Sequence, residues 1–248
     1  MFAQGAYQQA TIAYEFALFQ GLAPDDAASV TLSLNTAFKL EREYTKALAT
    51  FDRIDFYTGS DSLRSVLYYQ YIISAMLASR HDLAWSKLVE LRYELPGKIP
   101  EEVLLTLEIL CLNEMGRWQE AHQYFQKWSK IYGITKDPYP DMLKQKMKNP
   151  DKAFALSYWL PGVGQMYAGY PGKGLVSSLL NASLVAFSVY SFVGGYYLSG
   201  VFTGVALFYL SYNGGARYAQ VLAEEHNTKT KGKFNEQVRQ MLANGIKK

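Results

Sequence analysis

The sequence has little of the chemistry that most enzymes and metal proteins use. It contains one cysteine and three histidines, which excludes an intrachain disulfide and a cysteine-based zinc cluster. His81, His122 and His226 show neither an HExxH motif nor a paired ligand spacing. Cys111 lies in an apolar stretch, where a reactive thiolate is disfavoured. With no GxSxG motif either, we expect no catalytic activity, no bound metal and no cofactor.

Strong charge of either sign is also lacking, which argues against a nucleic-acid partner. The formal net charge is +3, whereas nucleic-acid proteins present a clustered basic face. The Gly-rich string that starts near Gly162 fits neither a phosphate loop nor a dinucleotide fingerprint. Tyr167 stands where each motif needs glycine, and Gly174 stands where the phosphate loop needs Ser or Thr.

Charged side chains are absent from the long stretch 174–216, and Lys173 is the only one between 153 and 216. This length accommodates two membrane spans of about 20 residues each. The natural division is 175–192 and 196–212, with Gly194-Gly195 at the turn. We therefore expect a helical hairpin in a lipid bilayer. A hairpin buried inside a soluble helical protein is the competing interpretation.

Small, polar and aromatic residues within this stretch refine the expectation. Gly200-x-x-x-Gly204 predicts a close helix–helix contact, and Ser177 and Asn181 suit a helix that faces a partner. The partner helix could belong to the same chain or to a second copy, so a homo-oligomer formed through the hairpin stays open. Tyrosines at both ends resemble aromatic belts at two membrane interfaces; they are Tyr190, Tyr196 and Tyr197 at the turn, and Tyr170, Tyr209, Tyr212 and Tyr218 at the other end.

The first half of the chain is repetitive. Ala10, Ala47, Ala84 and Ala121 recur every 37 residues. Residues at −3, +4 and +7 from each alanine keep the same step, as expected for the apolar stripe of an amphipathic helix. These residues are Tyr7, Tyr44, His81 and Trp118; Tyr14, Phe51, Leu88 and Phe125; and Ala17, Ile54, Leu91 and Trp128.

Further helices with the same period are expected at 32–40, 66–77 and 103–112, so each repeat is a helical hairpin. Stacked hairpins form a curved solenoid whose concave surface usually binds a protein. On the first helices we expect Tyr68, Tyr69 and Tyr71 to be exposed, which makes them the candidates for partner binding.

The pattern Gly116-x-Trp118-x-x-Ala121-x-x-x-Phe125, echoed from Gly5 to Tyr14, resembles the second half of a tetratricopeptide repeat. The resemblance covers residues 1–132, and its period exceeds the usual value of about 34, which puts extra residues in the loops. The resemblance implies a protein-binding role. Because the first repeat begins at its second helix, either the domain starts with an unpaired helix or the natural chain extends upstream. We expect the second, and a signal peptide could lie in that extension.

The string SYWLPGVGQMYAGYPGKG, residues 157–174, is the most specific in the chain. It resembles the LPGxGQxYxGxxxxG signature of small bacterial membrane domains related to two-transmembrane-hairpin proteins, and the resemblance covers 150–227. Pro161 should break a helix there, which makes 154–170 an interfacial or re-entrant segment. We expect a structural role for the matching residues, in which glycines allow close packing against the hairpin and Gln165 satisfies backbone groups. The matches are Leu160, Pro161, Gly162, Gly164, Gln165, Tyr167, Gly169 and Gly174.

The expected fold is all-α, a helical-hairpin repeat solenoid followed by a membrane helical hairpin. A polar helix from Arg217, a basic loop with Lys229, Lys231 and Lys233, and a last amphipathic helix should follow; that helix either lies on the membrane surface or packs on the repeats. The expected parts are a repeat domain at 1–132, a linker at 133–152, a membrane domain at 153–216 and a helical tail at 217–248.

These features favour an integral protein of a bacterial membrane that acts as a scaffold and binds a protein partner through its repeats. The alternative is a small membrane component of a transport or cell-envelope assembly machine. Lysines on both sides of the apolar stretch place both flanks in the cytoplasm by the positive-inside rule. An upstream signal peptide would instead place the repeats in the periplasm.

Overall fold

The computed structural model describes residues 6–57 and 59–246, and this part of the chain is helical without a strand. The prediction of an all-α protein is therefore confirmed. Gly5, which begins the first repeat motif, lies outside the described residues. The chain divides into unit 1, residues 1–143 and 238–248, and unit 2, residues 144–237.

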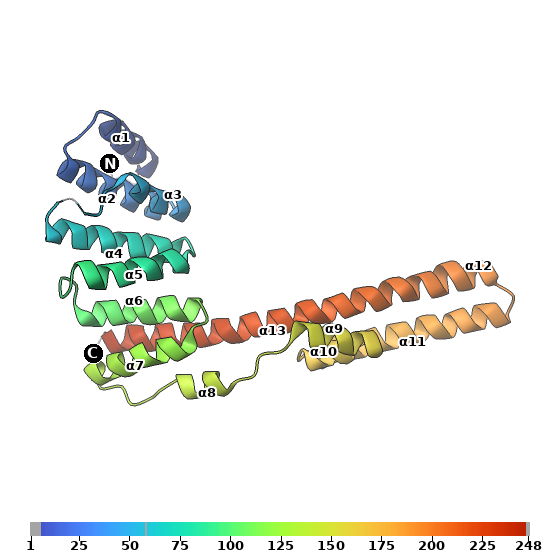
Figure 1. The fold of residues 1–248 in the computed structure, drawn as a ribbon. Coiled ribbons are helices and arrows are strands. Elements are labelled where there is room, and N and C mark those ends of the chain that lie inside the picture. Colours follow the sequence, from blue (N-terminus) through green and yellow to red (C-terminus); the bar gives the residue numbers. More distant parts are fainter. Residues whose placement is uncertain (1–5, 58, 247–248) are drawn as a thin grey trace. The chain divides into compact units, whose positions relative to one another are not determined.

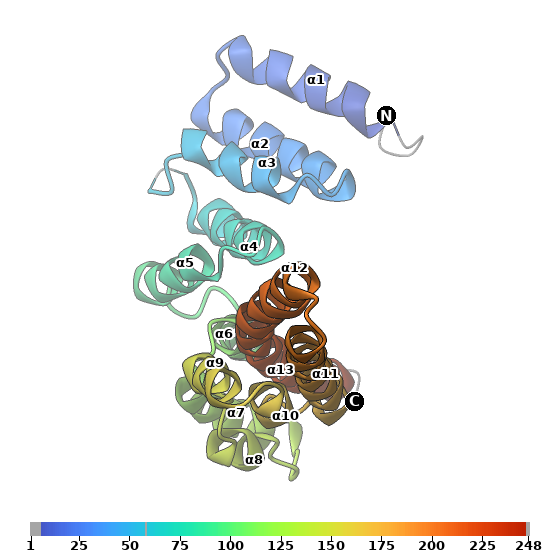
Figure 2. The same ribbon diagram turned by 90° about the vertical axis from the view of Figure 1, so that its right-hand side faces the viewer.

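Unit 1 is a succession of helices, each packed on the next (Figures 1 and 2). The helices predicted at 32–40, 66–77 and 103–112 are all present within longer ones. The elements are α1 (Tyr7–Phe19), α2 (Pro24–Leu40), α3 (Tyr44–Ala49), the 3₁₀ turn η2 (Thr50–Arg53), α4 (Asp61–Leu77), α5 (His81–Glu94), α6 (Glu101–Glu114), α7 (Trp118–Tyr132) and α8 (Tyr139–Lys144).

The repeating alanines lie at the centre of this packing. Ala47, Ala84 and Ala121 are fully buried, and Ala10 is 1% exposed. Larger side chains one and two turns later fill the space around them. Phe51, Leu88 and Phe125 lie one turn later, Leu91 and Trp128 lie two turns later, and all five are buried. Burying one large apolar side chain contributes about 1.5–3 kcal/mol. The alanines of the predicted stripe and the larger side chains after them are therefore part of the core of unit 1, whereas the stripe residues at −3 are half-buried.

The C-terminal part of α13 (Ala206–Ile246) completes unit 1. Val238 and Leu242 are buried, and a Cβ added at Gly245 would overlap the indole ring of Trp128. Arg239 Nη2 also donates a hydrogen bond to Glu114 Oε1 at 3.0 Å. Of the two alternatives for the last amphipathic helix, the structure shows the one that packs on the helices of the first half.

The predicted basic loop at 229–233 is wrong, because α13 is one continuous helix through these residues. Lysine and threonine do not interrupt a helix as proline does. Lys229 also pairs with Glu225, one turn earlier, with an Nζ–Oε1 distance of 2.6 Å. Such i,i+4 pairs support the helix.

Unit 2 contains α9 (Pro150–Trp159), α10 (Val163–Tyr167), α11 (Pro171–Val193), α12 (Tyr197–Ser199), the π-helical turn η3 (Gly200–Val205) and the first part of α13. Within the described residues, α11 alone is long and apolar enough to cross a membrane by length and composition. The second predicted span, 196–212, is divided among α12, η3 and α13.

The segment after α11 folds back along it (Figure 1). Gly195 has φ +77°, and the amide of Tyr196 donates to the carbonyl of Ser191 at 2.8 Å, which confirms the predicted glycine turn. A Cβ added at Gly204 would overlap the Ser188 side chain on α11. Gly204 is therefore a close-packing position, as predicted.

Candidate functional site: the elbow before α11 and its groove

The elbow, residues 157–174, holds the signature residues and begins where α9 ends. Leu160 is extended, with φ −142° and ψ 114°, as expected before a proline. Gly162 then takes φ +97°, a conformation that favours glycine, and α10 starts at Val163. The predicted helix break at Pro161 is confirmed.

Three signature glycines allow the backbone of the elbow to pack closely. A Cβ added at Gly162 would overlap the carbonyl oxygen of Gly174, and one at Gly174 would lie 2.5 Å from the carbonyl oxygen of Gly162. This pair joins the elbow to the first turn of α11. Gly164 differs from the prediction, because a Cβ there would overlap the carbonyl oxygen of Ala153 on α9 and not the hairpin. α9 folds back onto α10, which puts its backbone closest to Gly164.

Gly169 lies in the elbow between α10 and α11. It takes φ +95°, and a Cβ there would lie 3.0 Å from His226 Nδ1 on α13. Any side chain at this position would therefore be strained by its backbone and crowded by α13.

Gln165 is the polar centre of the elbow and is 1% exposed. Its Oε1 accepts a hydrogen bond from Ser157 Oγ at 2.7 Å, and its Nε2 donates to the carbonyl oxygen of Gly215 at 2.9 Å. Ser157 Oγ accepts from the Gly164 amide at 3.0 Å. Ser178 Oγ on α11 donates to the carbonyl of Pro161 at 2.6 Å. These bonds tie α9, α10, α11 and α13 together, which is what a structural role for Gln165 requires.

Tyr167 fixes the start of α9. Its hydroxyl accepts a hydrogen bond from the Asn149 amide at 3.1 Å, and the Asn149 side chain caps α9 by accepting from the Lys152 amide at 3.0 Å. The Nζ atoms of Lys148 and Lys152 lie 5.0 and 5.4 Å from the centre of the Tyr167 ring. Tyr167 thus links the basic residues before α9 to the elbow.

The end of α9 and the residue after it are exposed and apolar, and of these residues only Leu160 was predicted to belong to the site. Trp159 is 88% exposed, and Leu160 and Tyr158 are exposed beside it. The Tyr212 hydroxyl donates to the carbonyl of Tyr158, and their rings meet edge to face at 5.5 Å. The three aromatic and aliphatic letters YWL before Pro161 were the signal available in the sequence.

The surface of α11 is apolar and largely uncovered. Only 11% of its most apolar 18-residue window is buried. The facing segment is similar, with exposed Phe202, Val205 and Leu210. The exposed apolar residues of α11 include Leu175, Val176, Leu179, Leu180, Val185, Phe187, Val189 and Val193. A core helix of a soluble protein would instead be mostly buried.

A groove of about 600 Å³ runs beside α11 within unit 2. Val176 and Leu180 form an apolar wall, and Gly214 of α13 lies opposite. Lys173 and Tyr218 also line it, and Lys173 Nζ donates a hydrogen bond to Tyr218 Oη at 2.8 Å. The groove is therefore apolar with a cation among its lining residues.

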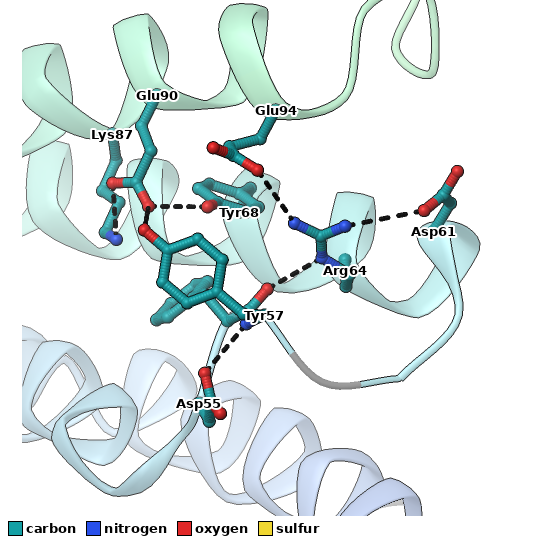
Figure 3. A network of polar contacts seen from close by, with 9 residues as sticks. Asp55, Tyr57, Asp61, Arg64, Tyr68, Lys87, Glu90 and Glu94 are labelled. Carbon is teal, nitrogen blue, oxygen red and sulfur yellow. Dashed lines mark hydrogen bonds and ion pairs between the residues drawn. The ribbon is translucent and has the colours of Figure 1, made fainter.

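The tyrosines predicted to bind a partner do not form an exposed surface. Tyr68 is fully buried, because α4 is packed between α3 and α5. Its hydroxyl donates to Glu90 Oε1 at 2.6 Å (Figure 3). Tyr71 is half-buried, with its ring 5.5 Å from Phe51, and Tyr69 is half-buried against the same core. The expectation of exposure is wrong for Tyr68.

Tyr68 belongs instead to a polar network that joins α4, α5 and the loop before α4 (Figure 3). Glu90 also accepts from Lys87 Nζ at 2.7 Å and from the Tyr57 hydroxyl at 3.2 Å. Burial alone would raise the pKa of Glu90, but the hydrogen bonds from Lys87 and Tyr68 outweigh it and lower that pKa. Arg64 Nε holds the loop through the carbonyl of Phe56 at 2.9 Å. The network therefore keeps a charged glutamate and fixes the loop.

The described residues contain no group of three or more His, Cys, Asp or Glu side chains that could hold a metal ion. No protein-family model matches the chain, and no curated protein or solved structure is significantly similar to it. The two resemblances therefore stay predictions.

Proposed function

We propose that the chain is a membrane-anchored scaffold for protein–protein interaction, without catalytic activity, in a bacterial membrane. In this proposal α11 and the segment that folds back along it form the membrane hairpin. The paired helices of unit 1 form a repeat solenoid that binds a protein partner. The observation that carries the proposal is the uncovered apolar surface of α11.

The energetic argument concerns what must cover that surface. One large apolar side chain that stays in water lacks the stabilisation of about 1.5–3 kcal/mol that its burial would contribute. Six such side chains would forgo on the order of 10 kcal/mol, which equals the whole stability of an ordinary domain. The hydrocarbon core of a bilayer covers all sides of the hairpin at once. Its helical backbone satisfies its own hydrogen bonds, as a lipid environment demands.

Aromatic residues support the placement of the hairpin across the bilayer. Tyr190, Tyr196 and Tyr197 are exposed at the turn, and Trp159 and Tyr158 are exposed at the opposite end of α11. Tryptophan and tyrosine prefer the membrane–water interface, where one part of the ring is apolar and the other is polar. The lysines before and after the apolar stretch in the sequence then favour a cytoplasmic location for unit 1.

An exposed apolar face on α1 supports a protein partner for unit 1. Ile12, Phe16 and Phe19 share one side of this helix at helical spacing and are 70%, 62% and 88% exposed. Contiguous apolar patches on a protein surface commonly mark interaction sites. Substituting Phe16 and Phe19 by serine should weaken partner binding without loosening the alanine core.

The anchor is tested by membrane fractionation of the expressed full chain with carbonate and detergent washes. The wild type should resist carbonate and dissolve in detergent. Val185→Lys puts a charge on the apolar surface of α11 at a cost of about 3 kcal/mol in a bilayer, and should raise the carbonate-soluble fraction. Val66→Lys on α4 is the matched control, because Val66 and Val185 are 44% and 46% exposed. Carbonate extraction of the wild type would overturn the anchor.

Protease access in sealed spheroplasts then tests the side of the membrane. Protection of unit 1 from external protease agrees with the cytoplasmic location that the lysines favour. Digestion of unit 1 from outside would place the repeats in the periplasm and contradict that location.

The alternative, a small membrane component of a transport or cell-envelope assembly machine, is favoured by one feature. The turn η3 is π-helical, and π-helical turns occur frequently at functional sites. Transport proteins, however, commonly carry Asp, Glu, Lys, Arg or His within their spans, and the sequence has none of these from 174 to 216. We therefore place this function second.

A further inference from the structure

The groove beside α11 is open along its apolar wall. Val176 is 67% exposed and Leu180 is 50% exposed, and both face a groove of about 600 Å³. A Cβ added at Gly214 or at Gly172, two further lining residues, would meet no atom within 4 Å. The side chains of unit 2 therefore leave room in the groove for an apolar ligand.

Lys173 supplies a positive charge to this groove. Its Nζ bonds the Tyr218 hydroxyl at 2.8 Å and lies 4.9 Å from the ring of Tyr170. Among the residues that the structure describes, no carboxylate lies within ion-pair distance of Lys173. Glu225, the acid whose charge acts on it, is already bonded to Lys229 at 2.6 Å. A negatively charged group at this position would complement Lys173.

We propose that the groove binds one anionic phospholipid. The phosphate contacts the Lys173 ammonium and the Tyr218 hydroxyl, and one acyl chain lies along Val176 and Leu180. Charge complementarity selects an anionic headgroup, and the apolar wall selects an amphiphile over a free anion. The inference rests on the proposed membrane anchor, because it places Lys173 at the interface where headgroups lie.

Two substitutions test the two parts of the groove separately. Lys173→Gln removes the charge and keeps a polar side chain of similar length. Gly214→Leu fills the apolar part, and leucine suits the helical backbone of α13. The matched controls are Lys233→Gln for Lys173→Gln and Gly232→Leu for Gly214→Leu, and both control positions lie on α13. Lys233 is exposed, and a Cβ at Gly232 also meets no atom within 4 Å.

The experiment is native mass spectrometry of the full chain in a non-ionic detergent, with equal amounts of phosphatidylglycerol and phosphatidylcholine of the same acyl chains. The wild type should retain one phosphatidylglycerol in preference to phosphatidylcholine by about fivefold, the effect of one lysine near a membrane surface. Lys173→Gln should lose this preference. Gly214→Leu should lose retention of both lipids, and the two controls should match the wild type.

Several outcomes would overturn the inference. An unchanged preference in Lys173→Gln would remove the charge from the argument, and unchanged retention in Gly214→Leu would remove the groove. Release of the lipid by millimolar inorganic phosphate alone would indicate a free-anion site. A wild type that is a dimer without lipid preference, and that Gly214→Leu converts to a monomer, would show that a second copy occupies the groove. Lys173→Gln alters an exposed side chain and carries the test even where Gly214→Leu fails to fold.

Failure of this inference is distinguishable from failure of the anchor. A chain that resists carbonate but shows no preference between the two lipids keeps the anchor and loses the lipid site. A chain that carbonate extracts loses both.

Discussion

Replacing Gln165 with leucine tests the elbow at its polar centre. Leucine keeps much of the volume but removes the bonds to Ser157 at 2.7 Å and to the Gly215 carbonyl at 2.9 Å. Two hydrogen bonds contribute about 1 kcal/mol each, and the Ser157 hydroxyl proton, left buried without an acceptor, costs about 1–3 kcal/mol more. Because the two effects overlap in part, we expect Gln165→Leu to lower the stability of the elbow by about 2–4 kcal/mol.

Hydrogen exchange of the full chain in detergent, followed by mass spectrometry, measures this loss locally. Peptides that cover 157–167 should exchange about 30-fold to 1000-fold faster in the variant. Peptides from α4 and α5 should not change. Gln237→Leu, an exposed position on α13, is the matched control. Exchange within threefold of wild type would refute the assignment of Gln165 as the residue that ties the elbow together.

Three further predictions concern other parts of the chain. Gly204→Val forces a branched side chain into Ser188 and should destabilise the hairpin by about 1–3 kcal/mol. The thermal unfolding midpoint in detergent should therefore fall. An unchanged midpoint would contradict the close contact between Gly204 and Ser188. Arg92→Met removes the guanidinium that bonds Glu108 at 2.5 and 2.8 Å, and Glu108 is only 2% exposed. The buried carboxylate left without its partner should cost about 3–5 kcal/mol of stability. Protection of α5 and α6 from hydrogen exchange should therefore fall, and retained protection would contradict the buried pair. Burial raises the pKa of Cys111 to about 12. Alkylation of this thiol by iodoacetamide at pH 8 should therefore be on the order of 1000-fold slower in the folded chain than in the denatured chain. Equal rates would show an accessible thiolate.

The repeat positions could be predicted because their signal is periodic and local. Ala47, Ala84 and Ala121 share a step of 37 residues, and each lies where a neighbouring helix comes close. Tyr68, Tyr69 and Tyr71 could not be sorted in the same way. Successive residues turn by about 100° around a helix, and α4 has neighbours on two sides. Which tyrosine is buried depends on the placement of α3 and α5.

The elbow was predictable in its backbone but not in its partners. Pro161 and Gly162 predict a helix break because of the backbone conformations that proline and glycine adopt. The Gly215 carbonyl that accepts from Gln165 lies 50 residues further along the chain, and no local pattern pairs them. The continuity of α13 through Lys229 was missed for another reason, since a run of charged residues indicates solvent exposure and says little about whether the backbone is helical.

The contribution of α13 to unit 1 has a consequence for synthesis on the ribosome. Translation at about 5–20 residues per second leaves on the order of ten seconds between the appearance of Trp128 and that of Gly245, which packs against it. The apolar residues of α11 emerge within this interval. Any machinery that recognises a nascent apolar helix therefore meets α11 while the indole of Trp128 still lacks its last neighbour. Under the proposed anchor, delivery to the membrane would begin before unit 1 is complete.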